Sequence, residues 1–129
     1  MRTTFFLLIT LLIGFTSCEK NTDDDRAQDE LELRNMFDEI TDLANSVPCT
    51  DSNDWEFIPY GSKACGGPQG YIAYSKSIDV DKFKDMVEDY SQAEEEFNIK
   101  YKIVSDCSVV QAPNGVICKD GKPEFVYNN

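Results

Sequence analysis

Histidine is absent from the 129 residues, and basic side chains are scarce, with 12 Lys and Arg against 24 Asp and Glu. Without histidine the chain cannot form a Ser-His-Asp or Cys-His catalytic arrangement, or a zinc site that contains histidine. The formal net charge is −12 and the basic residues are scattered, which argues against a nucleic-acid partner. No CxxC pair occurs, which excludes thioredoxin-like and zinc-ribbon proteins. We therefore expect no metal and no cofactor.

Catalytic patterns are also missing. Carboxylates are plentiful, but no two are singled out as the pair that glycoside hydrolysis needs, and a domain this small has little room for a cleft. Cys65-Gly66-Gly67-Pro68 lacks the Lys-Ser/Thr that follows a phosphate-binding loop. The Glu94-Glu95-Glu96 run could serve a metal or a partner, but tolerated surface charge is the simpler interpretation. We predict that the protein is not an enzyme and has no catalytic residue.

The N-terminal segment has the pattern of an export signal. Arg2 precedes an apolar run from Phe5 to Phe15, which is too short to cross a bilayer core of ~30 Å. Thr16, Ser17 and Cys18 follow, and this arrangement resembles the lipobox of bacterial lipoproteins. The resemblance implies a signal peptide over residues 1–17, cleavage before Cys18, and acylation of Cys18 with diacylglycerol and a fatty acid such as palmitate. An ordinary secretory signal is the alternative.

The segment after Cys18 is predicted to be an acidic flexible tether over residues 18–28. It has no apolar run, so it has nothing to bury. Its Asp23-Asp24-Asp25 run resembles the acidic signal that directs Bacteroidota-type lipoproteins to the outer leaflet of the outer membrane. The resemblance implies a surface-exposed outer-membrane lipoprotein. A solvating linker and a periplasm-facing protein remain the alternatives.

Four cysteines remain in the exported part: Cys49, Cys65, Cys107 and Cys118. An even number in an exported domain predicts two disulfides, with three possible pairings. The short-loop pairing, Cys49–Cys65 with Cys107–Cys118, is weakly favoured. A hairpin loop at residues 113–115 would point Cys107 and Cys118 to opposite faces, which counts against it. Pairing of the early cysteines with the late ones stays open.

The rest of the chain, residues 29–129, is predicted to form one α+β domain. Apolar residues at steps of three and four indicate helices over 29–47 and from Asp79 to about Asn98, with Asp79 as N-cap. Strands are expected at 55–58, 71–74, 100–105, 107–111, 116–119 and 124–127, with a tight turn at Asp120-Gly121. The expected architecture is two amphipathic helices packed on one small antiparallel sheet with a C-terminal meander.

The segment GSKACGGP at residues 61–68, followed by YIAYS at 71–75, resembles a family of small uncharacterised bacterial exported proteins and lipoproteins. Residue Tyr90, the VSDC segment at 104–107, and Cys118 before Gly121-Lys122 strengthen the resemblance, which covers most of residues 49–127. It implies a shared disulfide-linked domain and brings no catalytic residues.

Two functional classes survive these arguments, besides a purely structural envelope lipoprotein. The first is a non-catalytic binding module for an extracellular protein, peptide or glycan, with a candidate binding loop of Tyr60, Ser62, Lys63 and Ala64. The second is a substrate-like inhibitor of trypsin-type proteases, in which Lys63 would enter an acidic pocket and a Cys65 bridge would pin the loop. An aromatic platform for a sugar or peptide is a further possibility, with Trp55, Tyr60, Tyr71 and Tyr74 as its candidates. Core packing is the simpler role for Trp55 and for one face of the strand from Tyr71 to Tyr74.

Overall fold

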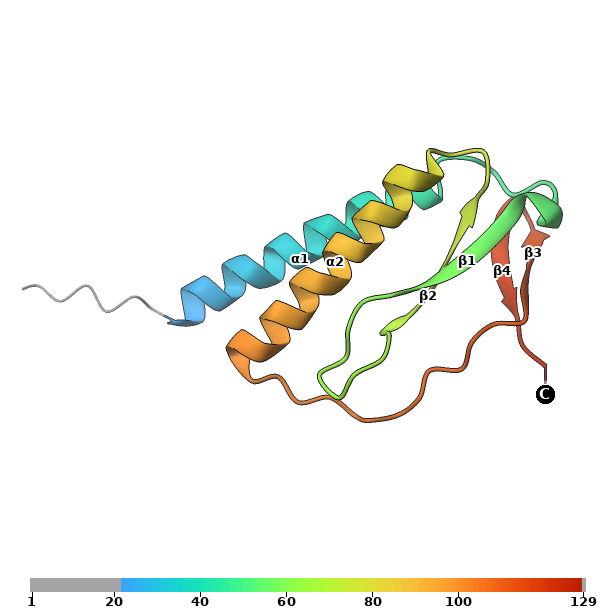
Figure 1. Ribbon diagram of the computed structural model, residues 1–129. Coiled ribbons are helices and arrows are strands. Elements are labelled where there is room, and N and C mark those ends of the chain that lie inside the picture. The colour runs from blue at the N-terminus through green and yellow to red at the C-terminus, as the bar shows by residue number, and fades with distance from the viewer. Residues whose placement is uncertain (1–21, 129) are drawn as a thin grey trace, which may run out of the picture.

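The computed structural model describes residues 22–128, which form two helices and two antiparallel β-hairpins (Figure 1). The predicted α+β class is confirmed. The predicted signal peptide and Cys18 lie outside the described residues. In chain order the elements are α1 (Thr22–Ala44), a 3₁₀ turn (Ser52–Asp54), β1 (Trp55–Tyr60), β2 (Gly70–Ser75), α2 (Val80–Tyr101), β3 (Gly115–Lys119) and β4 (Lys122–Val126).

Helix α1 begins at Thr22, so residues 22–28 of the predicted tether are helical. Two features favour this earlier start. The three aspartates at 23–25 occupy the first turn, where the helix dipole favours negative charge. Arg26 also pairs with Glu30, one turn further on, at 2.8 Å. The helix ends at Ala44, three residues before the predicted end, and the side chain of Asn45 donates to the carbonyl of Thr41.

Helix α2 follows the predicted N-cap, and the Asp79 side chain accepts a hydrogen bond from the backbone N–H of Lys82 at 3.1 Å. It passes the predicted end at Asn98 and continues to Tyr101, where Lys102 takes the left-handed conformation with φ 51°. The predicted strand over 100–105 is therefore wrong. Tyr101 belongs to the alternating pattern that suggested a strand, but it lies on α2 one helical turn after Phe97. The two rings pack with centroids 4.7 Å apart.

The β1–β2 hairpin packs against other elements on both of its faces. Its antiparallel register runs from Trp55 opposite Ser75 to Tyr60 opposite Gly70. Because side chains alternate between faces, one face presents Ile58, Tyr60, Ile72 and Tyr74 to the helices. There they join the core of Ile40, Ala44, Phe83, Val87 and Tyr90. This packing makes the hairpin the middle layer of the molecule.

The β3–β4 hairpin packs against part of the other face of β1–β2, at one end of that hairpin (Figure 1). The Phe57 ring meets those of Phe125 and Tyr71 edge-on, each with centroids 6.0 Å apart. The predicted turn is confirmed, with Asp120 and Gly121 both at positive φ. The single sheet is not found, because β1–β2 and β3–β4 form two separate two-stranded sheets. The strand predicted over 107–111 is likewise absent, and this stretch is coil.

The predicted two disulfides are present, but the favoured pairing is wrong. Cys49 bonds to Cys118 and Cys65 bonds to Cys107, so both bridges join an early cysteine to a late one. The cause is the path of the coil after α2, which returns past the β1–β2 loop and brings Cys107 beside Cys65. At the other end of the molecule, the backbone N–H of Cys49 donates to the carbonyl of Gly121 in the β3–β4 turn.

Candidate functional site

The β1–β2 loop contains the predicted binding residues, but it turns most of them inward. The Lys63 side chain is only 9% exposed. Its Nζ donates to the carbonyl of Ser108 at 2.9 Å and lies 3.3 Å from a carboxylate oxygen of Asp106. Among the four predicted loop residues, Ala64 alone is exposed. The cation therefore holds the coil after α2 and does not project toward a protease.

The start of the same loop is docked on α2. The backbone N–H of Ser62 donates to Glu94 Oε2 at 2.6 Å, and Asn98 donates to the Ser62 carbonyl at 2.7 Å. The Tyr60 ring packs against Phe37 of α1 with centroids 4.8 Å apart. These contacts fix the loop through its own backbone and through the side chain of the last β1 residue, so Tyr60 and Ser62 support the fold.

Glu94 differs from the other two glutamates of its run, because it is half-buried whereas Glu95 and Glu96 are exposed. Burial raises the pKa of the Glu94 carboxyl, and the hydrogen bonds from Ser62 and Tyr90 oppose that rise. Its two carboxylate oxygens accept hydrogen bonds from protein groups, which is a structural role. Within residues 22–128 there is no group of three His, Cys, Asp or Glu side chains that could hold a metal ion.

The four aromatic side chains considered as a platform do not share a surface. Trp55 and Tyr74 are 6% and 1% exposed, and their predicted core role is confirmed. Tyr60 and Tyr74 face the helices, while Tyr71 packs against Phe57 on the opposite face. Tyr74 also donates to Glu56 at 2.8 Å, and burial together with this carboxylate raises its pKa to about 12.

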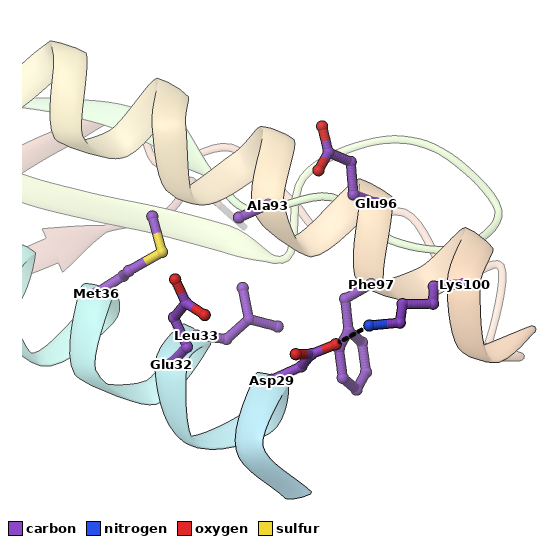
Figure 2. A pocket seen from close by; sticks show the side chains of 8 residues that line it. All are labelled: Asp29, Glu32, Leu33, Met36, Ala93, Glu96, Phe97 and Lys100. Atoms are coloured by element: carbon purple, nitrogen blue, oxygen red, sulfur yellow. Dashed lines mark hydrogen bonds and ion pairs between the residues drawn. The ribbon is translucent and has the colours of Figure 1, made fainter. Parts of the chain in front are cut away.

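A groove between α1 and α2 is the surface feature that sequence reasoning missed (Figure 2). It encloses about 230 Å³. Each helix contributes four residues at the spacing i, i+3, i+4 and i+7, which is one stripe of a helix. The apolar floor is made of Leu33, Met36, Ala93 and Phe97, and the polar rim of Asp29, Glu32, Glu96 and Lys100.

One end of the rim is closed by an ion pair between the helices. Lys100 Nζ lies 2.6 Å from Asp29 Oδ2 (Figure 2). The Tyr101 hydroxyl donates to the same oxygen at 2.7 Å. These two contacts lower the pKa of Asp29. Further along the rim, Glu96 accepts only from Gln92 at 3.1 Å, and Glu32 makes no hydrogen bond or ion pair within the described chain. Two carboxylates on facing helices therefore lack a cation.

Negative charge is concentrated on the helices that form the groove. Helix α1 contains nine acidic and two basic residues, and α2 contains seven acidic and three basic. Their combined formal charge is −11, whereas residues 45–79 and 102–128 contribute only −2. The rim carboxylates thus lie within the most negative part of the described chain, where the potential attracts cations.

The sequence contained a signal for this groove. Asp29 and Glu32 border the apolar stripe of α1, and Glu96 and Lys100 border that of α2. The acidic side of α1 was expected to be wholly solvated, but its edge faces a second helix.

Comparison of the chain with protein-family models, curated proteins and solved structures finds no match. Neither helix of the described part has the length and apolar character required to cross a bilayer.

Proposed function

We propose that this chain is a bacterial envelope lipoprotein, exported by residues 1–17 and acylated on Cys18, whose folded part is a non-catalytic binding module. The apolar run, the small residues at 16 and 17 and the single cysteine after them support the anchor. The aspartates at 23–25 support display on the outer face of the outer membrane. Several acyl chains would hold the protein firmly, because each buried CH₂ contributes ~0.8 kcal/mol.

The groove between α1 and α2 carries the binding role. Side chains such as Leu33 and Phe97 leave apolar surface open between the helices, although the rest of the core is closed by the hairpins. An apolar surface with a polar rim is typical of a recognition site. The inhibitor hypothesis gains no support from the loop, because the Lys63 side chain is held against the coil at 106–108.

The anchor would place this groove near the membrane. Helix α1 begins four residues after Cys18, and a fully extended chain spans at most ~3.5 Å per residue, so Thr22 would lie within roughly 14 Å of the acylated residue. Asp29 lies about two helical turns further along α1. The partner of such a module would therefore be a molecule that approaches or belongs to the same membrane surface.

The anchor is tested by metabolic labelling. Labelled palmitate should enter the wild-type protein and not a Cys18→Ala variant, and the intact mass should correspond to an acylated chain that starts at Cys18. Protease added to intact cells should remove the domain if it is displayed outside. An unmodified N-terminus at any other residue would contradict the anchor, and full protection on intact cells would leave a periplasm-facing protein.

Binding is tested by photo-crosslinking in the cells that make the protein. A photoreactive residue at position 93, on the groove floor, should give a discrete adduct. The same residue at position 85, on the exposed side of α2, should not. Absence of adducts at both positions would contradict a binding role for the groove.

A further inference from the structure

We infer that the groove between α1 and α2 binds a cationic amphipathic helix of a partner protein or peptide. This inference rests on the proposed binding function and specifies its ligand. Three independent features of the groove point to this ligand: its size, the arrangement of its floor, and the charge of its rim.

The size of the groove argues against a free small molecule. Sites for such ligands usually enclose roughly 300–1,000 Å³ and surround most of the ligand. At about 230 Å³, this groove is smaller and lies open between two helices. That volume accommodates one or two apolar side chains that project from a larger partner.

The floor has the geometry that an additional helix requires. The stripes on α1 and α2 run along the two helix axes, so an apolar ridge laid between them would contact both. Helix-in-groove recognition uses this arrangement, with apolar anchors one helical turn apart. Met36 adds an adaptable side chain to the floor, and the half-buried ring of Phe97 offers the largest contact area.

The rim determines the sign of the partner's charge. Glu32 of α1 extends between the helices, whereas Glu96 borders the groove on α2 with its carboxylate directed away from α1 (Figure 2). Neither has a cation within the described chain, and the one rim cation, Lys100, is already paired with Asp29. A partner helix that flanks its apolar face with Lys or Arg would place cations near both glutamates. The net charge of −11 on the two helices would also speed its approach and repel acidic helices.

The experiment uses the full chain in a nonionic detergent and measures fluorescence anisotropy of a labelled 18-residue amphipathic peptide. One face of the peptide is leucine and the other is lysine, and a second peptide has glutamate in place of lysine. The lysine peptide should bind the wild-type chain, and the glutamate peptide should not. Detergent without protein provides the blank for both peptides.

Two double variants separate the groove from general attraction to an acidic surface. Glu32→Lys with Glu96→Lys reverses the two rim carboxylates. Asp38→Lys with Asp85→Lys makes the same change in net charge at exposed positions of the same helices, outside the groove. The rim variant should weaken binding by roughly tenfold or more, whereas the matched control should stay within about threefold of the wild type. Far-UV circular dichroism and thermal melts confirm that each variant is folded.

The inference is overturned if the lysine peptide does not bind, if the glutamate peptide binds equally, or if both double variants lose affinity equally. Filling the groove with Ala93→Leu keeps the charge unchanged and should weaken binding. Unchanged affinity in that variant would also overturn the inference. If the peptide assay fails but crosslinking from position 93 still traps a partner, the ligand class is wrong and the binding module stands.

Discussion

Glu94 Oε2 accepts a hydrogen bond from the backbone nitrogen of Ser62 at 2.6 Å, across 32 residues of sequence. Two further contacts run in parallel between α2 and the loop, from Gly61 to Ser91 and from Asn98 to Ser62. Glu94 is thus the half-buried acidic member of a polar seam that fixes the β1–β2 loop to α2. A carboxylate at such a position couples the stability of the domain to pH.

We expect ionisation of Glu94 to lower the free energy of unfolding as the pH rises. Its pKa is raised above the ordinary value of 4.5 in the folded protein, chiefly by burial. The folded state therefore holds the proton more tightly than the unfolded state. The resulting stabilisation is fully present below about pH 4.5 and is lost as the pH rises through the folded pKa. A Glu94→Gln variant should lack this loss, because the amide cannot ionise but can still accept from Ser62.

Urea unfolding of both proteins between pH 4 and pH 7 measures the effect. Glu95→Gln is the matched control, because Glu95 is the exposed neighbour of Glu94. The lowered pKa values of Asp29 and Asp106 act with the opposite sign, since their stabilisation is lost only as the pH falls below about 3.8. A Glu94→Gln curve that runs parallel to the wild type would contradict the prediction.

Two loop glycines should respond differently to alanine. Gly61 and Gly66 both have positive φ, at 74° and 88°, so alanine is strained at either position, by roughly 1–2 kcal/mol. At Gly61 the added Cβ would also lie 2.5 Å from Glu94 Oε2 and 2.7 Å from Gln69 Cγ, whereas at Gly66 it meets nothing within 4 Å. We expect Gly61→Ala to cost about 1–3 kcal/mol more than Gly66→Ala, as overpacking does.

Denaturant midpoints of the two glycine variants give the difference directly. Gly66→Ala serves as the control for backbone strain alone, because both substitutions put a side chain on a left-handed residue. Equal losses of unfolding free energy in the two variants would contradict the prediction. They would show that the side chains of Glu94 and Gln69 move aside for the added Cβ at no energetic cost.

Local sequence signals predicted the elements that are stabilised locally. The Asp79 cap and the Asp120-Gly121 turn depend on neighbouring residues, and both are found as predicted. The disulfide pairing was not predictable in the same way, because it depends on where the coil after α2 runs. That path is set by long-range contacts such as Lys63 with Ser108, which no local pattern encodes.

The groove illustrates the same limit. Periodicity identified an apolar stripe on each helix, with Leu33 on α1 and Phe97 on α2. Whether the edges of two stripes meet depends on how the helices dock, and that in turn depends on the hairpin packed beneath them. The apolar face of each helix was therefore predictable from the sequence, whereas the space between the two helices was not.

The two disulfides should differ in accessibility. Cys49 is 3% exposed, whereas Cys65 and Cys107 are both exposed. We expect mild reduction followed by alkylation to label Cys65 and Cys107 first, as identified by peptide mass spectrometry. On the chain-entropy model each bridge adds roughly 4 kcal/mol to the free energy of unfolding, so this energy does not distinguish the two bridges. Equal labelling of all four cysteines at every time point would contradict the order.

Removing the exposed bridge should loosen the coil more than the core. In a Cys65→Ala, Cys107→Ala variant the core residues Phe83 and Tyr74 keep their packing, so a cooperative melt should persist at lower temperature. Limited proteolysis within residues 102–114 should accelerate. A Cys49→Ala, Cys118→Ala variant is the comparison, and its coil should remain protected.

Burial of the Lys63 side chain has consequences for both stability and inhibition. Its ammonium group donates to the Ser108 carbonyl and lies beside Asp106, while its side chain is 9% exposed. Hydrogen bonds from charged donors contribute ~1.5–3 kcal/mol each, and exposure of Asp106 reduces that value. We expect Lys63→Ala to lower the free energy of unfolding by about 1–2 kcal/mol. Lys122→Ala is the control, since Lys122 is exposed and its side chain makes no hydrogen bond or ion pair in the described chain. It should change the free energy of unfolding by less than about 0.5 kcal/mol.

The same burial predicts that the wild-type protein does not inhibit trypsin. A substrate-like inhibitor must place its cation in the protease pocket before any rearrangement, and Lys63 would first have to break its contacts with the coil at 106–108. Titration of trypsin with the purified chain should leave activity unchanged, and cleavage after Lys63 should be slow. Cleavage there should accelerate in Asp106→Asn, because one partner of the ammonium group is weakened. Stoichiometric inhibition by the wild type that disappears in Lys63→Ala would contradict this prediction and restore the inhibitor function.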